Sequence, residues 1–118
     1  MDVRRIRADE WHQLRALRLR ALADAPMAFG ATFAQEEAFP EKIWRDRAAG
    51  GAASGDRVTF VAEQDGRWVG LATCLLAGSE ISFPTLVGMF VDGSVGRQGI
   101  GVALVESVIG WARSRGAA

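Results

Sequence analysis

The sequence predicts a mixed α+β domain in which a central, mostly antiparallel sheet is flanked by helices. Two apolar, β-branched runs are joined by an Asp-Gly pair, which is a strong signal for a β-hairpin. Amphipathic patterns with helical spacing precede and follow these runs. The 118 residues, 49% of them hydrophobic, match the length and apolar content of one ordinary domain. We therefore expect residues 1–118 to form a single domain.

The N-terminal part of the chain predicts a strand followed by a helix. Met1–Arg7 alternates apolar residues with arginines, which is typical of a short edge strand. Ala8–Ala23 is predicted to be helical, with Asp9 and Glu10 in its first turn, where the helix dipole favours negative charge. The apolar residues that fall on one side of this helix are Trp11, Leu14, Leu17, Ala21 and Leu22.

The middle of the chain predicts a second helix, a linker and a hairpin. The helix is expected from Pro40, a residue favoured at the first helical position, to about Ala48. Ala48–Asp56 is a run of Ala, Gly and Ser without periodicity, which predicts a linker. Val58–Glu63 and Trp68–Leu76 are the two strands of the predicted hairpin.

The C-terminal part predicts one more strand and one more helix. Ile81–Asp92 is an apolar run, and Pro84 within it marks a sheet edge or a bulge because proline cannot donate a ladder hydrogen bond. Gly101–Arg115 is predicted to be helical, and Gly116 suits its C-terminal cap. The expected order is therefore one strand, two helices, three strands and one helix.

Composition excludes several classes of protein. Fourteen basic residues balance fourteen acidic ones, so the sequence lacks the basic face expected of a nucleic-acid-binding protein. No apolar run approaches the roughly 20 residues of a membrane span, and no leader opens the chain. The single cysteine, Cys74, cannot form an internal disulfide. We expect a cytoplasmic protein that binds neither nucleic acid nor membrane.

The segment Val91–Val102 joins the last strand to the last helix through a glycine-rich turn. The first turn of a helix carries unpaired N–H groups and partial positive charge, which favour phosphate. Glycines at 96, 99 and 101 leave these donors accessible, and Arg97 adds positive charge. A P-loop is excluded because no Lys-Ser or Lys-Thr follows, and the pattern fits a dinucleotide fingerprint poorly. The alternative is a glycine-rich connection without a ligand.

This segment resembles the acetyl-CoA-binding motif of the GCN5-related N-acetyltransferases (GNAT), Arg/Gln-x-x-Gly-x-Gly/Ala. The resemblance extends over the whole chain and includes the hairpin sequence Phe60-Val61-Ala62-Glu63 followed by Asp65-Gly66-Arg67-Trp68-Val69-Gly70. The chain departs from the motif at Gly96, where the family places Arg or Gln, and at Gly93, where proline is usual. Gly96 removes one side-chain donor, but the backbone donors remain.

The resemblance implies a GNAT-like acyl-CoA N-acyltransferase fold, acetyl-CoA as acyl donor and a primary amine, on a small molecule or a peptide, as acceptor. It implies that the pantetheine arm pairs with the backbone of a strand bent by a bulge, at Met89, Phe90 and Val91. It also implies that the pyrophosphate is held by the amides of Arg97, Gln98, Gly99, Ile100, Gly101 and Val102.

The family domain continues beyond the helix that follows this motif, with further strands and a helix, whereas this sequence ends there. The resemblance therefore implies a C-terminally truncated domain, without the tyrosine often proposed to protonate the departing thiolate; the chain has no tyrosine. Ile81–Asp92 is then expected to form an open, apolar sheet edge. That edge predicts completion by a partner, for example as a homodimer.

No catalytic residue is assigned from the sequence. Glu80 is a candidate base, although it is read mainly as a solvated turn residue, and Thr85 occupies the position that the family most often uses. Arg18 lies within the apolar stripe of its helix. It either holds an acidic acceptor or has a structural role, as an ion pair or as a snorkelling side chain, and we favour the structural role. His12 is expected at the surface and Cys74 in the core, and no metal site is expected.

Three functions remain open at this point. The leading interpretation is an acetyl-CoA-dependent N-acetyltransferase in which the amine attacks the thioester directly. The second is a non-catalytic acyl-CoA-binding module, or an incomplete acetyltransferase without turnover. The third is a sensor of a phosphate-bearing ligand unrelated to coenzyme A. The identity of the acceptor amine is not predicted.

Overall fold

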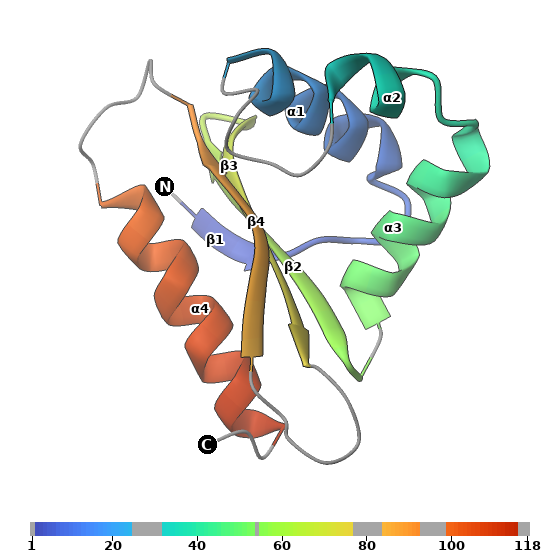
Figure 1. Cartoon of the computed structure of the whole chain (residues 1–118). Helices are drawn as coiled ribbons and strands as arrows, with labels where there is room; N and C mark the ends of the chain where they lie inside the picture. Colours follow the sequence, from blue (N-terminus) through green and yellow to red (C-terminus); the bar gives the residue numbers. More distant parts are fainter. Residues whose placement is uncertain (1, 25–31, 54, 77–83, 93–98, 116–118) are drawn as a thin grey trace.

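A computed structural model describes residues 2–24, 32–53, 55–76, 84–92 and 99–115. Within these ranges, one strand is followed by three helices, three strands and a last helix (Figure 1). The elements are β1 (Asp2–Arg5), α1 (Trp11–Asp24), α2 (Phe33–Glu37), α3 (Glu41–Ala53), β2 (Arg57–Gln64), β3 (Arg67–Leu76), β4 (Pro84–Val91) and α4 (Ile100–Ser114). The predicted mixed α+β class with a central antiparallel sheet is confirmed.

The described strands form one sheet in the order β1-β2-β3-β4, and each neighbouring pair is antiparallel. The predicted hairpin is confirmed: Asp65 and Gly66 both have positive φ, 53° and 75°, as a tight turn that follows the twist of the strands requires. β1 is an edge strand, as expected. β4 is the other edge of the sheet within the described chain.

Both faces of the sheet are covered. Helices α1, α2 and α3 lie on one face and α4 on the other (Figure 1). The core under α1 and α3 includes Trp44, Val61 and Leu71, whereas the core under α4 includes Val69 and Leu104. The register of β2 and β3 shifts near Ala62, which adds one residue to β3. This bulge interrupts the alternation of side chains between the two faces of β3. Trp68 and Leu71 therefore lie in the same core, although they are three residues apart.

Helix α1 begins later than the sequence suggested. The prediction placed Ala8 at its start and Glu10 in its first turn, but the helix begins at Trp11. Glu10 instead accepts hydrogen bonds from the Arg4 guanidinium at 2.8 and 2.7 Å and from the Arg7 backbone N–H at 2.9 Å. These hydrogen bonds hold the turn between β1 and α1. Glu10 thus pairs with Arg4 of β1, instead of lying in the first turn of the helix as predicted.

The predicted apolar side of this helix is largely confirmed. Leu14, Leu17, Ala21 and Leu22 are buried. Trp11 is only half-buried.

The linker predicted over Ala48–Asp56 is wrong, because α3 continues to Ala53. Gly51 allows this part of the helix to approach the sheet: a Cβ at that position would lie 2.7 Å from Thr59 Oγ1. The Arg5 Nε also donates to the Gly51 carbonyl at 2.8 Å. The small residues of this segment therefore do not form a flexible linker. They allow α3 to pack closely against β2.

The short helix α2 was missed, so the predicted order lacked one element. It begins with a capping box in which the Gln35 N–H donates to Thr32 Oγ1 and the Thr32 N–H donates to Gln35 Oε1. The sequence contained this signal, because Thr and Gln three residues apart are typical of a helix start. The helix places Glu36 against α1 and α3.

Glu36 is a buried carboxylate held between two arginines. Arg18 of α1 donates to both of its oxygens, at 3.1 and 3.2 Å, and Arg47 of α3 donates at 2.9 Å. Burial alone raises the pKa of Glu36, but the hydrogen bonds from Arg18 and Arg47 more than offset it and leave the pKa below its ordinary value. The structural role favoured for Arg18 is confirmed: its ion pair with Glu36 links α1, α2 and α3.

Replacement of Glu36 by glutamine is expected to lower the free energy of unfolding at pH 7 by about 3 kcal/mol, because two arginines then lose their counterion in a largely buried place. A carboxylate with a lowered native pKa stabilises the fold above its unfolded pKa, and this contribution is lost as the pH falls through the native pKa. The deficit of Glu36→Gln should therefore shrink in acid. Urea denaturation between pH 3 and 7 measures it.

The matched control is Glu37→Gln, which changes the exposed neighbouring residue. It should stay within about 0.5 kcal/mol of the native chain, as surface substitutions usually do. Equal unfolding midpoints for the two variants at pH 7 would contradict a stabilising role for the Glu36 cluster.

Candidate functional site

The N-terminus of α4 presents uncapped backbone donors. Gly99, with φ of +74°, is the N-cap residue and supplies no side-chain cap. Its carbonyl accepts from the Ala103 N–H at 3.0 Å, so the N–H groups of residues 100–102 precede the first intrahelical donor. The first turn contains no acidic residue, and Val102 is 63% exposed. A terminus of this kind favours an anion, since its donors and its dipole act together.

The strand β4 has no neighbour on the side away from β3 in the described chain. Its register with β3 shifts between the pairs Thr73–Gly88 and Cys74–Leu86, so Val87 is an extra residue on β4. The bulge expected in this strand is confirmed. It lies immediately before Met89–Val91, the backbone that the resemblance assigns to the pantetheine arm.

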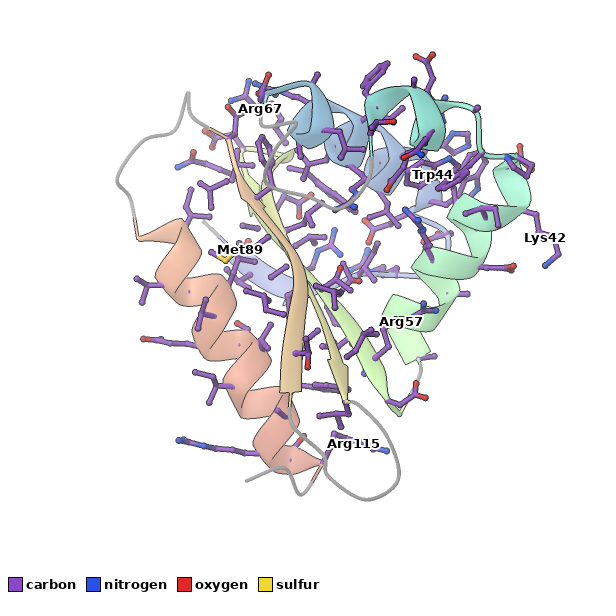
Figure 2. The ribbon with its side chains drawn as sticks, viewed as in Figure 1. Lys42, Trp44, Arg57, Arg67, Met89 and Arg115 are labelled. Atoms are coloured by element: carbon purple, nitrogen blue, oxygen red, sulfur yellow. The ribbon has the colours of Figure 1, made fainter. Side chains whose placement is uncertain are left out.

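Helix α4 approaches the sheet closely because two glycines lie at the contact. A Cβ on Gly70 would lie 3.0 Å from the Phe90 carbonyl oxygen and 3.1 Å from Leu104 Cδ1. A Cβ on Gly101 would lie 3.0 Å from Met89 Cε. The first turn of α4 is thus held beside β4, with Met89 between the helix and the sheet (Figure 2).

A cavity of about 210 Å³ lies on the opposite face of the sheet, under α1 and α3. Its wall includes Gly88, next to Met89, so it reaches the same strand as the helix terminus but from the other face. Trp44 and Arg57 lie on this side of the sheet (Figure 2). The residues lining the cavity are Leu14, Arg18, Trp44, Arg47, Arg57, Thr59, Leu71, Thr73, Leu75, Val87 and Gly88.

The structure brings together seven of the nine predicted cofactor-binding residues along the end of β4 and the start of α4: Met89, Phe90, Val91, Gly99, Ile100, Gly101 and Val102. Only the backbone of Ile100 can serve a ligand, because its side chain is buried in the core under α4. Arg97 and Gln98 lie outside the described residues, as do Glu80 and the glycines at 93 and 96.

His12 and Cys74 have the environments that the sequence predicts. His12 is exposed and its ring stacks on Trp11, with centroids 3.6 Å apart. Cys74 is fully buried, and burial raises the pKa of its thiol, which makes it a poor nucleophile. Thr85 is exposed on β4. Within the described ranges, no group of His, Cys, Asp and Glu is arranged to hold a metal ion.

Sequence reasoning missed the cavity and the charges around it. Arg47 and Arg57 come from segments that were read as a short helix and the edge of a linker, and neither belongs to a motif. The only early signal was Arg18, a charge inside an apolar stripe. Its neighbours in space come from α2, α3 and β2, which local patterns cannot reveal.

The fold and the bare helix terminus define an acyl-CoA N-acyltransferase type of architecture. The sequence matches the Acetyltransferase (GNAT) family over residues 10–118. The chain belongs to this family. No curated protein gives a significant sequence match. None of the described helices is long and apolar enough to cross a membrane.

Solved GNAT structures share the fold. An acetyltransferase from Streptococcus pneumoniae superposes with a TM-score of 0.75 at 16% identity, covering 98% of this chain and 68% of that one. A predicted acetyltransferase from Clostridium acetobutylicum, solved with acetyl-CoA, superposes with a TM-score of 0.74 at 14% identity, covering 99% of this chain and 76% of that one. AAC(6')-Iy, solved with the bisubstrate analogue CoA-S-monomethyl-acetylneamine, superposes with a TM-score of 0.72 at 19% identity, covering 98% of this chain and 74% of that one.

Replacement of Gly70 by alanine is expected to destabilise the protein by about 2 kcal/mol, because the added methyl group meets the Phe90 carbonyl and two side chains of α4. Chemical denaturation measures the change. Gly110→Ala is the matched control: it lies in the interior of α4 with open space around it, so it should stabilise the helix by about 0.5–1 kcal/mol. Native-like stability of Gly70→Ala would contradict the close approach of α4.

Proposed function

We propose that this chain is an acetyl-CoA-dependent N-acetyltransferase domain that transfers the acetyl group to a primary amine. One observation carries the proposal: the uncapped first turn of α4 lies beside the edge of β4 that no other described strand pairs with. Family membership and the GNAT fold support it. Similar structures solved with acetyl-CoA or a CoA-containing analogue show that this architecture can hold such a ligand.

The start of α4 supplies the phosphate site. The N–H groups of Ile100, Gly101 and Val102 donate to the pyrophosphate oxygens, and the helix dipole favours their negative charge. Gly99 adopts positive φ at the turn into the helix, which a residue with a Cβ adopts at a cost. No acidic side chain in this first turn competes for the donors.

The edge of β4 supplies the arm site. The backbone of Met89, Phe90 and Val91 pairs with the amides of the pantetheine arm as a neighbouring strand would. An arm that runs from the start of α4 along β4 brings the thioester toward the bulge at Val87 and Gly88. Gly88 also lines the cavity under α1 and α3. The acceptor amine therefore approaches from that cavity.

The transfer itself is a direct attack. The neutral amine nitrogen forms a bond to the thioester carbonyl carbon, the carbon–sulfur bond breaks and the sulfur departs as thiolate. The new amide nitrogen then loses a proton, which passes to the thiolate or to water. An alkylamine is mainly protonated at neutral pH, with a pKa near 10.4, so its proton must pass to water or a base. The protein contributes mainly by holding the two reactants in position and by a backbone amide that polarises the carbonyl.

Calorimetry with CoA and with desulfo-CoA tests the coenzyme site. Gly101→Val is expected to weaken CoA binding at least tenfold, or about 1.4 kcal/mol, because the added side chain enters the contact between the first turn of α4 and Met89. Gly110→Ala, on the same helix, should bind CoA as the native chain does. Undiminished CoA binding by a folded Gly101→Val would contradict the phosphate site.

A thiol-release assay over a panel of primary amines tests turnover. Release of CoA with at least one amine, together with a product heavier by one acetyl group, is the expected result. Tight CoA binding without thiol release would support the alternative of a non-catalytic acyl-CoA-binding module. Pairing of the β4 edge with a second copy of the chain stays a prediction. Sedimentation of the same protein samples measures whether the chain is a monomer or a dimer.

A further inference from the structure

The cavity under α1 and α3 is small and strongly basic. Its volume of about 210 Å³ is below the roughly 300–1,000 Å³ typical of pockets for drug-sized ligands. Three arginines line it, Arg18, Arg47 and Arg57, and no acidic residue is among the described residues of its wall. Thr59 and Thr73 add hydroxyl groups to the wall. A compact ligand with negative charge fits this lining better than a large or cationic one.

Two of the three arginines already share a counterion. Arg18 and Arg47 both donate to Glu36, so these three side chains carry one net positive charge. Arg47 also stacks over the Trp44 ring at 5.1 Å. The two guanidinium groups are thereby fixed on the α1 and α3 side of the cavity, where they share the single carboxylate of Glu36.

Arg57 adds a charge without a counterion among the described residues. No described carboxylate forms a salt bridge with its guanidinium, which lies against Gly50 of α3. The adjacent acid, Asp56, borders a neighbouring hollow that Arg57 also lines, and it is not among the described residues of this cavity. Arg57 is half-buried, so its charge is less screened than that of a fully exposed arginine.

One residue of the wall, Trp44, also carries a buried donor without a partner in the described chain. Trp44 is fully buried, and its indole N–H has no hydrogen-bond partner in the described structure. A buried donor without an acceptor costs free energy unless a ligand or water satisfies it. The described lining of the cavity thus combines three arginines with two hydroxyl groups and contains no carboxylate.

We propose that the acceptor is a small amine that carries an anionic group, such as the carboxylate of an amino acid, and that Arg57 helps to bind this group. The inference rests on the proposed acetyltransferase function. The anionic group binds among the arginines, and the amine points toward Gly88 and the thioester. The same lining repels an amine that carries several positive charges.

Matched acceptors test the charge preference. The pairs are alanine with alaninamide, and phosphoethanolamine with ethanolamine; an aminoglycoside is a fifth acceptor. Acetyl transfer is followed by thiol release, and kcat/KM of the anionic member should exceed that of its neutral partner by at least tenfold. Comparison of the two pairs shows whether the site prefers a carboxylate or a phosphate as the anionic group. Equal or reversed preference, or best turnover of the aminoglycoside, would overturn the proposal.

Variants of Arg57 test the residue. Arg57→Gln should lower kcat/KM about tenfold for the preferred anionic amine, mainly through KM, and less than twofold for its neutral partner. Arg57→Lys should recover part of the loss, because the charge remains but the paired donors do not. Arg113→Gln removes an exposed arginine from α4, on the opposite face of the sheet (Figure 1). It should leave the ratio of kcat/KM for the anionic amine to kcat/KM for the neutral amine unchanged. Equal losses for anionic and neutral amines would indicate a purely structural role.

Direct binding separates failure of this inference from failure of the proposed function. If no amine supports thiol release, calorimetry with alanine and phosphoethanolamine alone still decides the anion site. Binding that weakens at least fivefold in Arg57→Gln but not in Arg113→Gln would support the anion site without the transferase activity. Absence of binding in that case would overturn the inference.

Discussion

The close approach of α4 to the sheet is the constraint on which the candidate site depends. Gly70 on β3 leaves no side chain between the strand and the helix, so Ile100 and Leu104 pack directly on the sheet. This packing places the first turn of α4 against Met89 on β4. Since backbone N–H groups can bind phosphate only where they are uncapped and accessible, the position of the helix start determines whether the glycine-rich segment can act as a binding site.

The opposite face of the sheet is organised by charge as well as by apolar packing. Glu36 joins three helices through Arg18 and Arg47, and the same arginines border the cavity. A buried carboxylate of this kind fixes geometry more than it adds stability, because desolvation offsets much of its attraction to the arginines. The cluster therefore holds two guanidinium groups rigidly at the place where an acceptor amine is proposed to enter.

Local sequence patterns predict the regular elements correctly, whereas they do not predict the elements that depend on distant partners. The Asp65-Gly66 hairpin and the apolar side of α1 follow from turn geometry and periodicity, which involve neighbours in sequence. The C-terminal half of α3 was read as a linker because Gly50 and Gly51 suggest flexibility; their purpose is close contact with Arg57 and Thr59. Glu10 was placed in a helix turn, but its partner is Arg4 on β1.

The sequence by itself determined the order of the strands, the antiparallel hairpin and the glycine-rich helix start, because each depends on the conformational preferences of a few consecutive residues. Only the tertiary structure decided that residues of β4 and α4 lie together at one edge. It also decided that three arginines from α1, α3 and β2 surround one cavity. Such a grouping depends on contacts between residues far apart in the chain, and no local preference encodes it.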